Sequence, residues 1–305
     1  MTHAFFPLQN DEAALAFLLD DLVARCEARG VPNMKPIFDE KKQAILAGLL
    51  PGLLLKKNDE PAGFVWADMV TENYGNMVFH SLDLNDQPVL VQGLLDSGLI
   101  HQKLMELITY ELHPDTRATI RAGGFLENPR KRMFLELNQA PKLPEIPPPY
   151  VLRPVTDADV LPSSALSLAA HLISQDQPSY PDLKNLATRE ALERKIYGGV
   201  FGPMSPTASF VLEREGRMVG ACLVVDIVCW GFDRVPWIFD LSIHPDFQGQ
   251  KLGRALFEAV IYQLYQERYE IVGLAVTLTN SGAIRLYDSL GFQSMEPFYE
   301  YVQPT

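Results

Sequence analysis

The chain has 305 residues and divides at a run of prolines. Prolines at 141, 144, 147, 148 and 149 fall within the segment 139–149. Proline excludes a helix interior and removes the hydrogen-bond donors that a strand needs, so this segment is predicted to be a stiff linker. A proline-rich surface loop inside one domain is the alternative.

The two parts of the chain beside this linker begin and end alike. Pro7 and Pro154 each precede an apolar-periodic segment with an acidic start, which is typical of a helix. Gly124-Phe125 and Gly291-Phe292 each precede an alternating stretch, which is typical of a strand. Matching starts and ends indicate a duplicated domain of about 150 residues. The predicted organisation is a first domain at 1–138, a linker at 139–149 and a second domain at 150–305.

In the second half, short apolar runs alternate with helix-like segments, and a hairpin is expected across Glu215-Gly216. This pattern predicts a mixed α/β domain with a central, largely antiparallel sheet flanked by helices. In the first half the predicted elements are strands near 53–57, 63–70, 76–82 and 87–93, and a helix at 99–111.

Composition and charge limit the function classes. The chain has 38 acidic and 26 basic residues and a net charge of −12, which argues against a nucleic-acid surface. Such acidity is typical of solubility alone, and a cationic substrate is the alternative that it also fits. Its three cysteines lack metal-ligand spacing and are typical of reduced thiols in a cytoplasmic protein. No basic signal region opens the chain, and the longest apolar run is broken by Pro51 and Gly52. We expect a cytoplasmic protein without a bound metal or a membrane span. Whether it forms a homo-oligomer is left open.

The segment Gln248–Ala255 follows an apolar run ending at Ile243 and opens a helix-like stretch. The first N–H groups of a helix lack intrahelical partners, and the macrodipole adds positive potential there. Glycines let the backbone approach a phosphate closely. The segment therefore predicts a phosphate-binding loop, with an ordinary glycine-containing turn as the alternative.

Two signatures give the second half a specific resemblance. Gln248 and Gly253 match the pattern Gln/Arg-x-x-Gly-x-Gly/Ala, with Lys251 in place of the middle glycine. The segment Asn280–Phe292 resembles a second signature of an Asn, an Ala, Leu-Tyr and Gly-Phe. With the opening strand Leu152-Arg153-Pro154, this order resembles the GCN5-related N-acetyltransferase (GNAT) superfamily over about residues 150–302.

The first half resembles a degenerate copy of the same domain. Its nearest candidate for the loop, Asp96-Ser97-Gly98-Leu99, would place an acidic side chain at the phosphate. Aligning the Gly-Phe ends of the two halves places Ile120 where Tyr287 stands and His113 where Asn280 stands. The tandem layout is similar to that of mycothiol synthase, although no residue here identifies a mycothiol precursor.

The resemblance implies two tandem GNAT folds, with catalysis in the second. It implies an acetyl-CoA-dependent N-acetyltransferase, an acyltransferase for groups other than amino-acyl groups. The acceptor would be a primary amine of a small molecule or a peptide, attacking directly in a ternary complex. Lys251 and the degenerate first half keep an alternative open, a non-catalytic acyl-CoA-binding or regulatory module.

The resemblance also implies which residues hold acetyl-CoA. Backbone groups of Leu241 and Ile243 would pair with the pantetheine arm. Asn280 would hydrogen-bond the same arm, or cap the helix that begins at Ser281. Loop N–H groups would hold the pyrophosphate, with the Lys251 ammonium in reach of a phosphate. The predicted loop contacts are Gln248, Gly249, Gln250, Lys251, Leu252, Gly253 and Arg254.

Two residues are predicted to move protons. Tyr287 lies in the second signature, and its phenol, with a pKa of about 10, can protonate the leaving thiolate as a general acid. Packing at the helix–sheet boundary is the alternative role for Tyr287. Asp240 faces opposite to Leu241 and Ile243 by strand alternation, which suits a general base in the acceptor cleft. An ion pair with Arg234 is the alternative role for Asp240.

Overall fold

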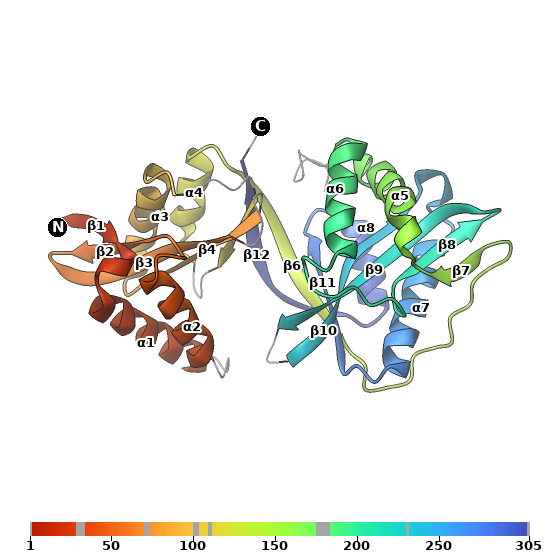
Figure 1. The fold of residues 1–305 in the computed structure, drawn as a ribbon, viewed down its shortest axis with the longest axis horizontal. Coiled ribbons are helices and arrows are strands. Elements are labelled where there is room, and N and C mark those ends of the chain that lie inside the picture. Colours follow the sequence, from red (N-terminus) through yellow and green to blue (C-terminus); the bar gives the residue numbers. More distant parts are fainter. Residues whose placement is uncertain are drawn as a thin grey trace. The chain divides into compact units, whose positions relative to one another are not determined.

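The computed structural model of the chain describes residues 2–28, 34–69, 74–99, 104–108, 112–174, 184–229 and 232–303. The chain forms two compact units. Unit 1 consists of Met1–Asn128 with Phe298–Pro304, and unit 2 consists of Pro129–Pro297. Each unit is a mixed sheet with helices on its faces (Figure 1). None of the described helices is long and apolar enough to cross a bilayer.

Unit 1 follows a strand–helix–helix–strand order. Its elements are β1 (His3–Pro7), α1 (Glu12–Ala28), α2 (Met34–Leu46), β2 (Gly52–Lys57), β3 (Glu60–Met69), β4 (Tyr74–Ser81), α3 (Gln87–Asp96), β5 (Leu104–Ile108) and α4 (Pro114–Ala122). The strand order is β1-β2-β3-β4-β5-β12, where β12 is Gln293–Val302. Neighbouring strands are antiparallel except β4 and β5, which are parallel.

The core of unit 1 has two layers because neighbouring residues of a strand face opposite sides of the sheet. Leu54, Phe64 and Trp66 pack with the apolar faces of α1 and α2. Leu55 and Val65 pack on the other side, with apolar residues of α3 and α4.

Two predictions for the first half are wrong. Residues 87–93, predicted as a strand, belong to the helix α3. Pro88 lies in the first turn of α3, where its fixed φ favours a helix, and Leu90 and Leu94 bury one helix face. The predicted helix at 99–111 contains the strand β5, because pairing with β4 and β12 overrides the local preference. Residues 100–103 and 109–111 of that range lie outside the described residues.

Apart from its first strand, unit 2 repeats the order of unit 1. Its elements are β6 (Leu126–Glu136), β7 (Val151–Pro154), α5 (Val160–Leu172), α6 (Leu186–Tyr197), β8 (Phe210–Arg214), β9 (Arg217–Cys229), β10 (Phe232–Ile243), α7 (Leu252–Gln266), β11 (Ile271–Thr277) and α8 (Ser281–Ser289). The strand order is β6-β11-β10-β9-β8-β7, antiparallel except for the pair β10–β11. The mixed, largely antiparallel sheet predicted for this half is confirmed.

The last strand of each sequence half completes the sheet of the other half. In unit 2, β6 pairs with β11 from Arg130↔Thr277 to Glu136↔Ile271. In unit 1, the end of β12 pairs with β5 from Tyr299↔Leu107 to Val302↔Leu104. Residues 129–138, which the sequence places in the first domain, therefore lie in unit 2.

The proline-rich segment 139–149 contains no helix or strand. Its end packs on unit 2, where Ile146 and Tyr150 contact a small apolar cluster that includes Leu252. The Tyr150 hydroxyl donates a hydrogen bond to Gln250 Oε1 at 2.8 Å. The end of the segment therefore packs against, and hydrogen-bonds to, the loop that leads into α7.

Candidate active site

Strands β10 and β11 separate in the middle of the unit 2 sheet. The pairing of β10 with β9 shifts register between Ile238 and Asp240, which bulges the strand at Phe239. Parallel pairing of β10 with β11 covers Trp237↔Gly273 and Ile238↔Leu274. Within residues 232–303, no later residue of β10 pairs with β11. A bulge bends a strand, and a parted edge leaves N–H and C=O groups available to a ligand.

The loop after β10 ends in two left-handed residues. Gly249 has a φ of 75° and Lys251 a φ of 61°. The first backbone hydrogen bond of α7 runs from the Ala255 N–H to the Lys251 carbonyl at 3.1 Å. The N–H groups of residues 252–254 precede this bond and open onto the loop, where the helix dipole is positive.

Side chains fix the shape of this loop. The Gln248 amide donates to the carbonyl of Ile243 at 3.0 Å, which ties the loop to the end of β10. Arg254 bonds Glu258 at 2.8 Å and the Ser289 hydroxyl at 2.6 Å, which joins α7 to α8. The loop is thus held in shape by contacts within unit 2.

Lys251 occupies a position that suits glycine. A left-handed conformation costs a non-glycine residue about 1–2 kcal/mol because its Cβ approaches the following carbonyl. Lys251 is exposed and caps α7 without a hydrogen bond from its side chain. The Lys251 side chain is therefore exposed at the start of α7.

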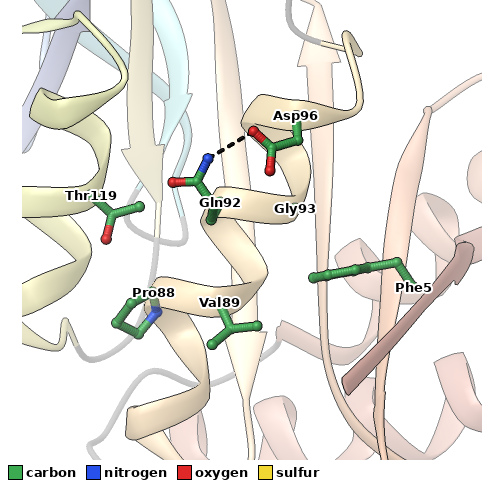
Figure 2. A pocket seen from close by; sticks show the side chains of 7 residues that line it. All are labelled: Phe5, Pro88, Val89, Gln92, Gly93, Asp96 and Thr119. Atoms are coloured by element: carbon green, nitrogen blue, oxygen red, sulfur yellow. Dashed lines mark hydrogen bonds between the residues drawn. The ribbon is translucent and has the colours of Figure 1, made fainter. Parts of the chain in front are cut away.

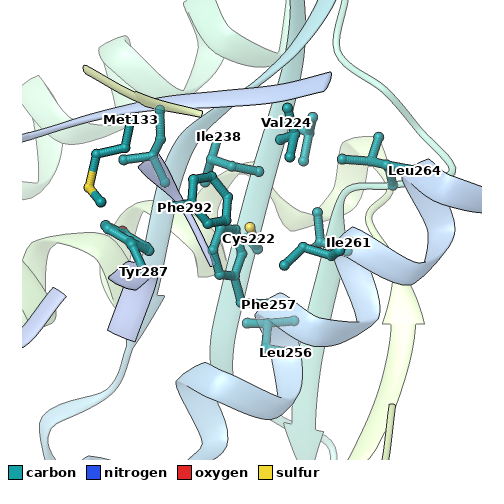
Figure 3. Close-up of a cluster of buried hydrophobic side chains, with 14 of the residues drawn as sticks. Met133, Cys222, Val224, Ile238, Leu256, Phe257, Ile261, Leu264, Tyr287 and Phe292 are labelled. Atoms are coloured by element: carbon teal, nitrogen blue, oxygen red, sulfur yellow. The ribbon is translucent and has the colours of Figure 1, made fainter. Parts of the chain in front are cut away.

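Tyr287 lies in the hydrophobic core of unit 2 and is 8% exposed. Its ring packs edge-on against Phe257, with centroids 5.4 Å apart, and is tilted against Phe292 at 5.8 Å (Figure 3). The same cluster includes Ile238, the last residue of β10 that pairs with β11. Packing therefore fixes the Tyr287 ring within the apolar cluster that lies beneath the separating strands.

Asn280 caps α8. Its side-chain oxygen accepts from the Ala283 N–H at 3.1 Å. This is the capping role that the sequence left open, at the carboxyl end of β11.

Asp240 projects from β10 toward α5, and its side chain is 12% exposed. Its Oδ1 lies 3.2 Å from His171 Nε2, and its Oδ2 accepts from the Ser242 hydroxyl at 2.9 Å. Burial works against the ionised form. The hydrogen bond and charge of His171, with the charge of Arg189, outweigh burial and hold the pKa of Asp240 below its ordinary value.

The orientation of the Asp240 side chain agrees with the prediction from strand alternation. Leu241 and Ile243 pack on the opposite side of the sheet, against α7. The alternative ion pair of Asp240 with Arg234 is wrong. Arg234 instead pairs with Asp226 at 2.7 Å.

Asp240 belongs to a polar network that sequence reasoning missed. The network lies between α5, α6 and β10, and many of its side chains are buried. Its members are Ser163, Ser167 and His171 on α5, Arg189, Glu193 and Tyr197 on α6, and Asp240 and Ser242 on β10. On each helix they recur every four residues, so they share one face. That spacing was the available signal.

Glu193 is the most buried carboxyl group of this network, at 1% exposed. Its Oε2 accepts from the Ser163 hydroxyl at 3.3 Å. Burial, followed by the negative charge of Asp240, raises the pKa of Glu193 to about 8. At neutral pH Glu193 therefore holds a proton while Asp240 is ionised, as two carboxyl groups do when their environments differ.

Unit 1 has carboxylates where unit 2 has its open loop. The turn between β4 and α3 contains Asp83 and Asp86, and Asp86 is 3% exposed. Lys57 Nζ lies 2.9 Å and 3.0 Å from the two carboxylate oxygens of Asp86, and His3 Nε2 lies 3.2 Å away. The segment Asp96–Leu99, the nearest sequence candidate for a loop in the first half, does not precede a helix start, because Asp96 ends α3.

The described parallel pairing in unit 1 is longer than that in unit 2. Pairing of β4 with β5 covers all of β5, from Tyr74↔Leu104 to Val78↔Ile108, and β3 pairs with β4 without a register shift. His113 caps α4 as Asn280 caps α8, which confirms the alignment of the halves. Ile120, fully buried, lies where unit 2 has Tyr287.

A separate pocket of about 390 Å³ lies on α3 of unit 1. It is lined by Phe5, Pro88, Val89, Gln92, Gly93, Asp96 and Thr119 (Figure 2). The Gln92 amide donates to Asp96 at 2.8 Å, and the Thr119 hydroxyl donates to the Asp115 carbonyl at 3.0 Å. The polar groups of this lining are engaged with near neighbours in sequence and do not converge on the pocket.

Comparison with known proteins finds a family match in the second half of the chain. Residues 172–292 match the Acetyltransferase (GNAT) family. The chain is 28% identical over 300 residues to a mycothiol acetyltransferase of Thermobispora bispora, across 93% of this chain and 92% of the relative. It is 44% identical over 84 residues to the [ribosomal protein bS18]-alanine N-acetyltransferase of Escherichia coli K12. That match spans 28% of this chain and about half, 53%, of the relative.

Solved structures share the fold along the chain. A GCN5-related N-acetyltransferase from Sphaerobacter thermophilus superposes with a TM-score of 0.61 at 15% identity, covering 98% of this chain and 94% of that one. A tandem GNAT protein of the clavulanic acid biosynthesis pathway gives 0.54 at 14% identity, covering 98% of each chain. Residues 172–292 thus form an acetyltransferase domain of the GNAT family, the chain has the fold of two tandem GNAT domains, and it is an N-acetyltransferase.

Proposed function

We propose that unit 2 transfers the acetyl group of acetyl-CoA to a primary amine by direct attack in a ternary complex. One observation carries this proposal, the separation of β10 from β11 after Ile238. The separation leaves the backbone edge of Asp240–Ile243 available, leading toward the open N–H groups of α7. Unit 1 has carboxylates in the corresponding turn between β4 and α3, so we assign acetyl transfer to unit 2.

The parted edge and the loop suit the two ends of the co-substrate. Backbone groups of Leu241 and Ile243 can pair with the amides of the pantetheine arm, and an N–H group there can polarise the thioester carbonyl. The N–H groups of Gly249 and residues 252–254 suit the pyrophosphate. Because the Asn280 side chain caps α8, we assign it to positioning the end of β11 rather than to direct binding.

The reaction needs a base that takes a proton from the amine and an acid that gives a proton to the leaving thiolate. The amine nitrogen attacks the thioester carbonyl, the C–S bond breaks, and the thiolate takes a proton from the Tyr287 phenol. The proton that the nitrogen loses as the amide forms balances the one that the phenol gave up, so the phenol is restored. Asp240 faces the opposite side of β10 from Leu241, so its carboxylate suits the amine side. An ammonium with a pKa of about 10.4 must lose a proton before it can attack.

The acceptor is proposed to be an amine of a small molecule or a peptide. One relative is a mycothiol acetyltransferase and another acetylates a ribosomal protein alanine. The net charge of −12 favours a cationic acceptor.

The test is turnover of acetyl-CoA by the full chain across a panel of polyamines, aminoglycosides, amino acids and peptide N-termini, read as release of free thiol. We expect amine-dependent thiol release and an acetylated product by mass spectrometry. Tight CoA binding with no transfer to any amine would instead support a non-catalytic acyl-CoA-binding module.

Lys251→Gly is expected to change stability and affinity in opposite directions. Relief of the left-handed conformation should raise the free energy of unfolding by about 1 kcal/mol. Loss of the ammonium beside the helix start should weaken CoA binding about two- to fivefold, as expected for an exposed charge pair. Chemical denaturation and calorimetry measure the two effects.

Lys251→Arg is the matched control, because it keeps both the charge and the strained conformation. It should leave stability and affinity close to wild type. A Lys251→Gly variant that binds CoA as well as wild type would show that the loop holds the pyrophosphate through its backbone alone.

A further inference from the structure

The bulge in β10 places an aromatic ring beside Asp240. In a regular strand, neighbouring side chains point to opposite faces of the sheet. Here Phe239 packs in an apolar cluster with Ile196 of α6. Asp240 faces the same side, where it contacts His171 of α5. Because Phe239 is the extra residue at the register shift before Asp240, the bulge puts the ring and the carboxylate on one face.

The ring of Phe201 extends this aromatic surface. Phe201 lies in the loop after α6, and its ring centroid is 4.8 Å from that of Phe239, with the ring planes at 35°. Both rings are partly exposed, although they belong to the apolar cluster on this side of the sheet. Phe239 directly follows Ile238, where the described pairing of β10 with β11 ends. The aromatic pair Phe201–Phe239 therefore lies where these two strands separate.

The loop that carries Phe201 is held against β9 by backbone contacts. The Asp226 N–H of β9 donates a hydrogen bond to the Pro203 carbonyl at 2.8 Å. Gly202 has a φ of 122°, and a Cβ at this position would collide with the Asp226 carbonyl oxygen. Because the loop is fixed in this way, the aromatic pair is formed before a ligand binds. Binding to it then costs little in side-chain ordering.

The charges around Asp240 suit a ligand with a single ammonium group. The Asp240 side chain is 12% exposed, so a ligand can reach its carboxylate. The positive charge of Arg189 on α6 also acts on Asp240. A second ammonium on the same ligand would be repelled by Arg189. One amine with an apolar remainder therefore fits this face better than a polyamine does.

We propose that the aromatic pair Phe201–Phe239 selects the acceptor, a primary amine that carries a large apolar group about two carbons from its nitrogen. The amine lies at Asp240 and the apolar group packs on the two rings. The spacing follows from the chain, because consecutive Cα atoms are about 3.8 Å apart and the ring and the carboxylate belong to adjacent residues. This inference rests on the proposed acetyl transfer in unit 2 and narrows its acceptor.

The test is the ratio of kcat/KM between matched acceptors, measured on the full chain at saturating acetyl-CoA. One pair is phenethylamine and ethylamine, and the other is triglycine and the same tripeptide with phenylalanine first. We expect the wild type to prefer the apolar member by about 10²-fold, as for a large apolar group in an apolar site. The pair with the higher kcat/KM shows whether the acceptor is a small molecule or a peptide. Equal values within both pairs, or a preference for spermidine, would overturn the inference.

Alanine variants test the two rings. Phe201→Ala and Phe239→Ala should each lower the ratio about five- to tenfold, the value of one aromatic contact. The ratio does not depend on the fraction of folded enzyme, so a destabilised variant still gives a result. Phe239→Leu keeps an apolar side chain and should retain part of the preference.

Phe232→Ala is the matched control, because Phe232 is an exposed aromatic residue at the start of the same strand. It should keep the wild-type ratio of kcat/KM. A wild-type ratio in both Phe201→Ala and Phe239→Ala would contradict the role of the aromatic pair.

Binding without turnover separates this inference from the proposed function. With CoA present, calorimetry should show that phenethylamine binds the full chain at least about tenfold more tightly than ethylamine, and Phe239→Ala should lose most of this difference. If the chain binds phenethylamine in this way but acetylates no amine, the proposed function fails and the aromatic pair stands as a binding site. If the chain acetylates amines without preferring apolar ones, this inference alone fails. If it neither binds nor acetylates them, both fail.

Discussion

Tyr287→Phe is expected to lower kcat by about 10²-fold or more, the usual contribution of a general acid. The ring is 8% exposed and packs against Phe257 and Phe292, so phenylalanine keeps these contacts and the fold. The loss therefore comes from the phenol rather than from packing. Steady-state kinetics with the best amine of the panel, together with calorimetry for acetyl-CoA, measures the effect.

Acetyl-CoA affinity should change little in this variant, because we assign the pyrophosphate and the pantetheine to backbone groups elsewhere. Phe292→Leu is a useful control, since it perturbs the same aromatic cluster without removing a phenol. A Tyr287→Phe enzyme with the full wild-type kcat would show that another group protonates the thiolate.

Tyr301→Ala is expected to destabilise unit 1 by about 3–5 kcal/mol, although Tyr301 is near the end of the second half of the sequence. The residue is fully buried in the core of unit 1, and its hydroxyl donates to Glu127 at 2.9 Å. A loss of this size is a large fraction of the stability of an ordinary domain. Hydrogen exchange should show faster exchange across β3, β4 and β5, while β8 and β9 stay protected.

Tyr301→Phe is the matched variant, since it keeps the ring and removes only the hydrogen bond to Glu127. Its cost should be about 1 kcal/mol to 3 kcal/mol, as for a hydrogen bond to a charged group. Unchanged protection of unit 1 in Tyr301→Ala would contradict the assignment of the last strand to that unit.

The sequence predicts the second half well because its signals are local. Short-range periodicity predicts the strands and the orientation of the Asp240 side chain. Hydrogen bonds within a few residues account for the Asn280 cap and for the contact of Asp240 with Ser242. The resemblance to GNAT proteins adds the loop 248–254, which has the left-handed residues and open N–H groups that such a loop needs.

Features that depend on distant partners were beyond such reasoning. Strand β5 is a strand because β4 and β12 pair with it, and residues 130–136 join β11 rather than the first half. The network of His171, Glu193 and Asp240 exists because two helices and a strand converge. Four-residue spacing on each helix hinted at it, but not at which carboxyl group would be protonated.

The most direct test of the account is a crystal structure of the full chain with CoA. The account predicts one CoA per chain, with its pyrophosphate on the N–H groups of residues 252–254 and its pantetheine along Asp240–Ile243. The thiol should end near Tyr287. CoA bound instead at the Leu84–Asp86 turn of unit 1, or along an edge other than that of β10, would contradict it.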